Sequence, residues 1–165
     1  MTIVVTLHLI CRKERQRNVF MLTRALSFHH SEGTRNAVCF SKTLPLGFDE
    51  AMRKTIGALR GEGFGIITEI DVKKTLKEKL GVEFRNYRIL GACNPKLAYE
   101  ALQLEGKIGT MLPCNVVVNE IAQGRTEVAA IDPVASMQAI DNPQLKQSAE
   151  RVRTLLQNVI ESLKG

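Results

Sequence analysis

The sequence Phe84-Arg-Asn-Tyr-Arg-Ile-Leu-Gly-Ala-Cys-Asn-Pro95 predicts a strand that leads directly into a helix. Residues 87–92 are mostly apolar and begin with an aromatic side chain, which is typical of a buried strand. Asn94 is a good N-cap residue, and Pro95 suits the first helical position, where its missing N–H costs nothing. We therefore expect a strand to end and a helix to begin at the pair Cys93-Asn94.

A second Cys-Asn pair follows in Ile108-Gly-Thr-Met-Leu-Pro-Cys-Asn-Val-Val-Val118. Pro113 is expected to break a strand just before Cys114, and the three valines after Asn115 are strong β-formers that resume it. One short helical run separates the two pairs. Because both pairs lie at strand ends, we expect Cys93-Asn94 and Cys114-Asn115 to converge in space.

Outside this stretch, apolar periodicity and turn residues predict a regular alternation of strands and helices. We expect a hairpin turn at 122–125, with Gly124 supplying a positive φ. The predicted fold class is α+β, a single compact domain at 37–165 with helices packed on a mixed or antiparallel sheet. The remaining predicted strands are 37–43, 64–70, 116–121 and 126–131, and the remaining helices run from Asp49 (as N-cap) to Gly61, over 72–80 behind Asp71, over 134–140, and from Pro143 onward.

Residues 1–36 do not continue this alternation. The apolar run at 2–10 is too short to span a bilayer, and no small-residue cleavage site follows it, so a secretory signal is not expected. We interpret 1–36 as an N-terminal extension outside the fold, with an extra structural element or a weak membrane-surface anchor as alternatives. His8, His29 and His30 all lie here. An enzyme with a Ser-His or Cys-His pair would therefore need one of them to fold back onto the domain.

The formal net charge of +6 comes largely from basic residues before residue 38. The rest of the chain is nearly balanced and lacks a basic face interleaved with aromatic side chains, so we expect no nucleic-acid partner. No membrane partner is expected either. The four cysteines have no CxxC spacing and no companion histidine at metal-site spacing, which disfavours structural zinc and favours reduced thiols in a cytoplasmic protein.

Five ordered motifs, at 61–71, 76–82, 87–95, 112–118 and 128–133, resemble one bacterial and archaeal family, the domain of unknown function 302 family. The resemblance extends from about residue 38 to residue 163. It implies a compact α+β domain of the TATA-binding-protein-like fold group and a homodimer, but no established activity. Likeness of fold to a DNA-binding protein does not bring DNA binding with it.

The candidate ligand site consists of Cys93, Asn94, Cys114 and Asn115. Paired thiols suit a soft metal ion such as Cu(I), thiol–disulfide exchange or a covalent bond to an electrophilic ligand. The uncharged amides suit a small-molecule pocket. Alternatively the cysteines are packing residues, because a free cysteine often behaves as a small buried hydrophobe.

A second set of candidate residues is Glu69, Asp71 and Arg88. The two acids lie on the same side of their predicted strand, where they are able to face Arg88 or Lys42. We expect them to act as charge partners and as a helix cap rather than as acid–base catalysts.

These patterns predict a binding or accessory module for a small ligand, with its pocket at the two Cys-Asn pairs. The alternative is a thiol redox or Cu(I)-binding protein that uses Cys93 and Cys114. No cofactor and no set of catalytic residues is identified, and enzymatic activity is not expected.

Overall fold

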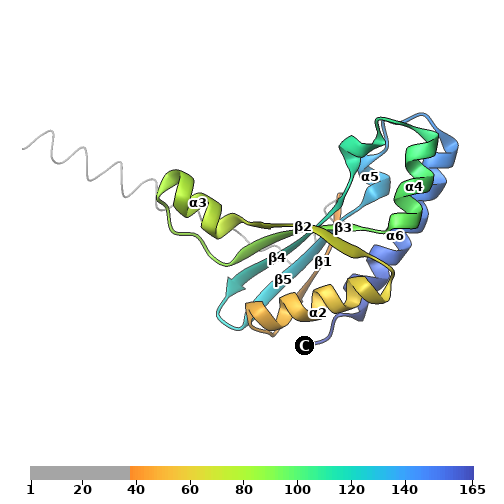
Figure 1. Cartoon of the computed structure of the whole chain (residues 1–165). Coiled ribbons are helices and arrows are strands. Elements are labelled where there is room, and N and C mark those ends of the chain that lie inside the picture. The colour runs from red at the N-terminus through yellow and green to blue at the C-terminus, as the bar shows by residue number, and fades with distance from the viewer. Residues whose placement is uncertain (1–37) are drawn as a thin grey trace, which may run out of the picture. The chain divides into compact units, whose positions relative to one another are not determined.

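Five strands form one antiparallel sheet in the order β1-β5-β4-β3-β2 (Figure 1). The computed structural model describes residues 38–165, so the predictions for residues 1–36, including the three histidines, lie outside the described residues. The predicted α+β class is confirmed, and the sheet is wholly antiparallel rather than mixed. The strands are β1 Cys39–Leu44, β2 Gly65–Asp71, β3 Tyr87–Cys93, β4 Cys114–Ala122 and β5 Arg125–Ile131.

Side-chain alternation sends one set of apolar residues to a single face of the sheet. On β4, Val116 and Val118 are fully buried, whereas Val117 between them is only half-buried on the other face. The strand register places Val118 opposite Val128 on β5 and Val116 opposite Leu90 on β3. The buried side chains therefore line up across the central strands and form the main core.

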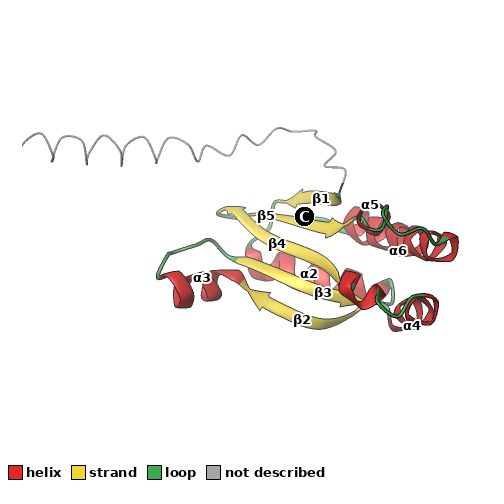
Figure 2. Ribbon diagram, turned by 90° about the horizontal axis from the view of Figure 1, so that it is seen from above, coloured by secondary structure: helices red, strands yellow, loops and turns green. Residues whose placement is uncertain are grey.

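Two long helices cover this face, α2 Phe48–Gly61 and α6 Pro143–Ser162 (Figure 2). Ala51 and Leu59 of α2, and Leu156 and Val159 of α6, are buried in the same core cluster as the sheet residues. Apolar residues at helical spacing thus make each helix amphipathic, and its apolar stripe packs on the sheet.

The first half of α6 extends beyond the sheet and packs against two further helices, α4 Pro95–Leu104 and α5 Pro133–Ser136 (Figure 1). A short 3₁₀ helix, η1 Ile108–Met111, follows α4. Ala101, Ile108 and Leu145 form a second, smaller core at this end. No helix within residues 38–165 has the length and apolar content needed to cross a bilayer.

At the opposite end of β2 and β3, helix α3 Val72–Leu80 projects away from the main core (Figure 1). None of its residues is buried. It ends at Gly81, whose φ of 67° is the left-handed conformation that glycine adopts without strain. The predicted helix at 72–80 is therefore confirmed, but polar contacts rather than core packing hold it.

Most predicted boundaries are confirmed, and the exceptions have simple causes. The prediction that Asp49 caps α2 is wrong, because Gly47 is the N-cap residue and Asp49 lies inside the first turn. An acid in the first turn is still favoured by the helix dipole. Residues 108–111 form a 3₁₀ turn instead of a strand, and the helical piece predicted at 134–140 ends at Ser136.

Asp132, buried at the end of β5, joins three elements. Its Oδ1 accepts a hydrogen bond from the backbone N–H of Val134, at 2.9 Å, and so caps α5. Its Oδ2 lies 3.2 Å from Nη2 of Arg153 on α6. The Arg153 guanidinium carbon is in turn 5.7 Å from the centre of the Phe40 ring on β1. This chain of contacts holds α5 and α6 at a fixed position relative to the sheet.

We expect Gly91→Ala to lower the free energy of unfolding by about 1–3 kcal/mol, the usual cost of overpacking. Gly91 is buried on β3, and a Cβ there would overlap Thr68 Oγ1 and lie 2.6 Å from Pro113 Cγ. Gly57→Ala in α2 is the control, because its Cβ meets no atom within 4 Å and alanine favours a helix by roughly 0.5–1 kcal/mol. Urea unfolding measures the free energy of unfolding of both variants. Equal changes in the two variants would contradict the close packing around Gly91.

Candidate functional site

An apolar pocket lies where β3 ends and β4 begins, beside α4, α5 and α6. Its empty volume is about 490 Å³ including the solvent at its mouth, but the centre of a water molecule fits in only about 40 Å³ of it. One buried water needs roughly 10–15 Å³ by this measure, so the pocket suits a small ligand. It is lined by Phe64, Ala92, Cys93, Asn94, Leu97, Ala98, Ala101, Leu112, Cys114, Pro133, Met137, Leu145, Ser148, Ala149 and Val152.

The antiparallel pairing of β3 with β4 brings Cys93 and Cys114 to this pocket. Cys114, the first residue of β4, is opposite Ala92 in the register, and Cys93 is the next residue along β3. Both cysteines are partly buried, neither forms a disulfide, and both line the pocket. The structure therefore brings the two thiols to the wall of one pocket.

Burial raises the pKa of both thiols, because an apolar environment disfavours the thiolate. The pKa of Cys114 rises to about 11, mainly through burial and further through the charge that Cys93 would carry. At neutral pH both thiols are protonated, so they are weak nucleophiles and weak hydrogen-bond donors.

Asn94 also lines the pocket, as its sequence position predicts. Its Oδ1 accepts a hydrogen bond from the Leu97 backbone N–H, at 3.3 Å, and thereby caps α4. Asn115, in contrast, is exposed and does not line the pocket. The structure does not bring Asn115 together with the other three candidates, because neighbouring residues of a strand point to opposite faces and Cys114 takes the pocket side.

The far wall of the pocket comes from residues that the sequence did not single out. Ala98 on α4 and Ala149 on α6 leave space, while Met137, just after α5, and Val152 on α6 close the sides. The apolar stripe of α6 was expected to cover the sheet. In the structure its second half does so, whereas its first half faces the pocket.

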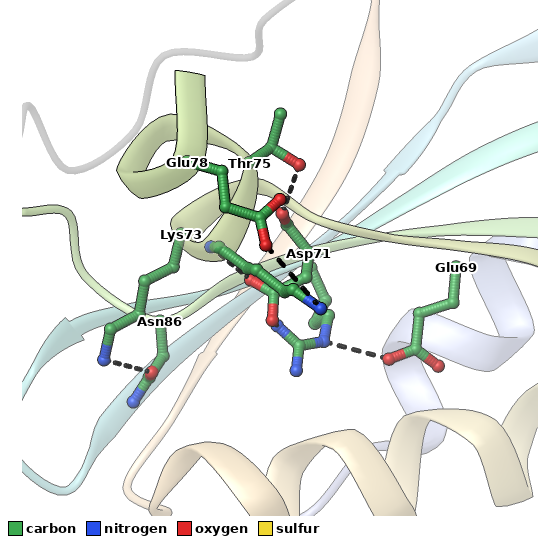
Figure 3. A network of polar contacts seen from close by, with 8 residues as sticks. Glu69, Asp71, Lys73, Thr75, Glu78 and Asn86 are labelled. Atoms are coloured by element: carbon green, nitrogen blue, oxygen red, sulfur yellow. Dashed lines mark hydrogen bonds and ion pairs between the residues drawn. The ribbon is translucent and has the colours of Figure 1, made fainter. Parts of the chain in front are cut away.

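Glu69, Asp71 and Arg88 form a separate polar network at the other end of the β2–β3 pair. Figure 3 shows Glu69 and Asp71 of this network. Arg88 Nε lies 2.9 Å from Glu69 Oε1, and its Nη1 lies 2.6 Å from Asp71 Oδ2. The backbone N–H of Lys74 donates to Asp71 Oδ1 at 2.8 Å, so Asp71 caps α3. Lys42 is not part of this network, because its Nζ donates to the Glu161 carbonyl at 2.9 Å.

The pKa of Asp71 is lowered by the Lys74 backbone N–H and by the nearby Arg88 guanidinium. Its carboxylate is therefore held in the charged form, unlike that of a general acid poised near neutral pH. A separate contact lies nearby, with Lys73 Nζ of α3 donating to Asn86 Oδ1 at 3.1 Å (Figure 3). These contacts fasten α3 to β3, which agrees with the predicted role of the acids as charge partners and a cap.

Within residues 38–165 no group of three or more histidine, cysteine, aspartate or glutamate side chains is placed to hold a metal ion. The pocket offers only two such groups, the thiols of Cys93 and Cys114. Any metal ion that the described chain holds there would therefore be a soft ion that two sulfur ligands can coordinate.

Residues 40–163 match a family model described as "Domain of unknown function DUF302". The chain is also similar to a solved structure, the crystal structure of an uncharacterized conserved protein DUF302 from Bacillus stearothermophilus. The sequence identity is 27%, the match covers 74% of this chain and 95% of the other, and the TM-score is 0.68. No curated protein matches this sequence.

We expect Asp71→Ala to destabilise the fold more than Asp71→Asn, because asparagine keeps an oxygen that caps α3 and loses only the ion pair with Arg88. The folded-state pKa of Asp71 lies below its ordinary value of 3.8. Its charge therefore stabilises the fold above that value, and this contribution is lost as the pH falls through the lowered pKa. In urea unfolding at neutral pH, wild type should have a higher free energy of unfolding than Asp71→Asn, and this difference should become smaller in acid. A difference in free energy of unfolding that grows in acid would contradict a stabilising ion pair between Asp71 and Arg88.

Proposed function

The chain belongs to the DUF302 family, and we propose that it binds a small, largely apolar ligand in the pocket between β3, β4, α4 and α6. The single observation that carries the proposal is the pocket wall. Apart from Asn94, Ser148 and the two thiols, its side chains are hydrocarbon or thioether. Small-molecule sites in proteins combine such walls with a few polar groups that fix orientation.

Charge supports the same ligand class. No Lys, Arg, Asp or Glu side chain lines the pocket. A charged ligand would lose its hydration there without gaining an ionic partner, which is costly. A neutral ligand avoids this cost and fills space in which the wall atoms otherwise lack packing partners.

The protonated thiols and the lack of a histidine within residues 38–165 favour binding over catalysis. A nucleophilic cysteine normally has a lowered pKa and a base beside it. We therefore propose a binding or accessory module that works with reduced thiols in the cytoplasm.

Methylenecyclopentane is a suitable apolar probe for the pocket. We expect it to shift the backbone amide NMR signals of Leu97, Ala98 and Ala149, which line the pocket wall. Ala98→Leu should weaken binding by at least about fivefold, because the added side chain occupies the space of the ligand. Ala122→Leu, exposed at the far end of β4, is the control and should bind like wild type. Equal weakening by both variants, or no shifts in wild type, would overturn the proposal.

A soft metal ion is a second candidate ligand, because Cys93 and Cys114 line the same pocket without a carboxylate or histidine beside them. Soft thiolates select Cu(I). We expect Cys93→Ser and Cys114→Ser each to reduce Cu(I) affinity in competition with bicinchoninate, and Cys39→Ser on β1 to leave it unchanged.

The pH dependence of Cu(I) binding follows from the raised thiol pKa values. Binding must displace protons from both sulfurs, so affinity should increase as the pH rises toward the Cys114 value of about 11. A pH-independent affinity, or one that survives both serine substitutions, would exclude the thiol pair as the metal site.

We also propose that the chain forms a homodimer. The face of the sheet opposite α2 and α6 carries the half-buried side chains of Ile89, Val117 and Ala129, and β1 is an edge strand of the sheet formed by residues 38–165. Both surfaces are of the kind that proteins cover. Light scattering at micromolar concentration should give about twice the chain mass of 18.4 kDa. A monomeric mass at all micromolar concentrations would contradict the proposed homodimer.

A further inference from the structure

We infer that the pocket selects neutral ligands that carry one hydrogen-bond acceptor, such as a ketone or another carbonyl compound with a small hydrocarbon body. This inference rests on the proposed ligand-binding function of the pocket. It follows from the hydrogen bonds of the polar side chains in the pocket wall. Their oxygen atoms already accept hydrogen bonds, whereas their N–H and O–H donors have no partner within the described chain.

The amide of Asn94 is the first of these donors. An N-cap side chain must present oxygen to the helix, so the bond from the Leu97 N–H to Oδ1 fixes the orientation of the amide. Its Nδ2 is then the free end, and it makes no hydrogen bond within residues 38–165. This amide group lies beside the backbone of Gly63, where a Cβ would be 3.2 Å from Nδ2.

Ser148 on α6 provides the second donor. Its Oγ accepts a hydrogen bond from Arg151 Nη2 at 3.3 Å, but its hydroxyl hydrogen has no acceptor in the part of the chain that the structure describes. Other hydroxyls of the same helix are satisfied, because Thr154 donates to the Glu150 carbonyl at 3.0 Å and Ser162 donates to the Val159 carbonyl at 2.8 Å. Ser148 is only 7% exposed and lines the pocket, so its hydroxyl is available to donate to a ligand there.

The two thiols add further hydrogen-bond donors to the pocket wall. Cys93 and Cys114 are protonated at neutral pH, and each S–H is a weak donor. A ligand oxygen that accepts from these groups would satisfy donors that an all-hydrocarbon ligand leaves unpaired, and sites of this kind reject analogues that lack the polar atom. A carboxylate would also accept hydrogen bonds, but no cationic side chain lines the pocket to offset its desolvation.

Three ligands with the same ring test this inference: cyclopentanone, methylenecyclopentane and cyclopentanecarboxylate. The first two differ only by an oxygen in place of a methylene group. We expect NMR titration of the full chain to show cyclopentanone binding about five- to tenfold more tightly than methylenecyclopentane, as one net hydrogen bond allows. Cyclopentanecarboxylate should bind most weakly.

Two variants assign the preference to its donors. Asn94→Asp keeps the oxygen that caps α4 but removes the Nδ2 donor, and Ser148→Ala removes the hydroxyl donor. Each should reduce the ratio of ketone to hydrocarbon affinity by at least about twofold. Ser162→Ala is the matched control, because its hydroxyl already has an acceptor and lies outside the pocket. The ratio is informative because general loosening of the pocket would weaken both ligands together.

The outcomes separate this inference from the function on which it rests. Equal affinities of wild type for cyclopentanone and methylenecyclopentane would overturn donor selection while leaving the apolar pocket in place. An unchanged ratio in both Asn94→Asp and Ser148→Ala would also overturn it. If neither neutral ligand shifts the signals of the pocket amides, the inference and the proposed function fall together.

Discussion

The antiparallel pairing of β3 with β4 is the constraint on which the rest of the structure depends. It aligns Leu90 with Val116 in the centre of the core and places Ala92 opposite Cys114 at the edge of the pocket. Full burial of one such aliphatic side chain stabilises a fold by about 1.5–3 kcal/mol, whereas an exposed ion pair contributes about 0–1 kcal/mol. The position of the pocket is therefore fixed by the same apolar pairing that supports the sheet.

The pocket lies where this rigid pairing meets less regular elements. Caps at Asn94 and Asp132 start α4 and α5 beside the strand ends, and the ion pair from Asp132 to Arg153 holds α6 near them. The first half of α6 then packs on α4 and α5 instead of on the sheet, and the small side chains Ala98 and Ala149 leave a space between the helices. Strand pairing thus supplies the floor with its two thiols, and helix packing supplies the apolar walls.

The two polar networks of the domain have different roles. At the α3 end, every charged group of the Glu69, Asp71 and Arg88 cluster has a partner, and the cluster holds a helix that buries none of its residues. In the pocket, Asn94 and Ser148 each use an acceptor within the protein and keep a donor without a partner in the described chain. Satisfied groups stabilise local structure, whereas donors left open in an apolar wall favour a ligand with an acceptor. This difference is why the pocket, and not the cluster of acids, carries the proposed function.

The sequence by itself determined the α+β class, most element boundaries and the helix caps at Asp71 and Asn94, because alternation, helical periodicity and capping chemistry act over a few residues. It also led us to expect Cys93 and Cys114 at one site, because both lie at strand ends that one short helical run connects, and both line the pocket. It grouped Asn115 with them, but Asn115 is exposed and outside the pocket, because alternation along β4 gives the pocket side to Cys114. The pocket walls and the unpaired donors of Asn94 and Ser148 were decided only by the tertiary structure, since they depend on how α4, α5 and α6 pack and on which hydrogen bonds that packing leaves unmade.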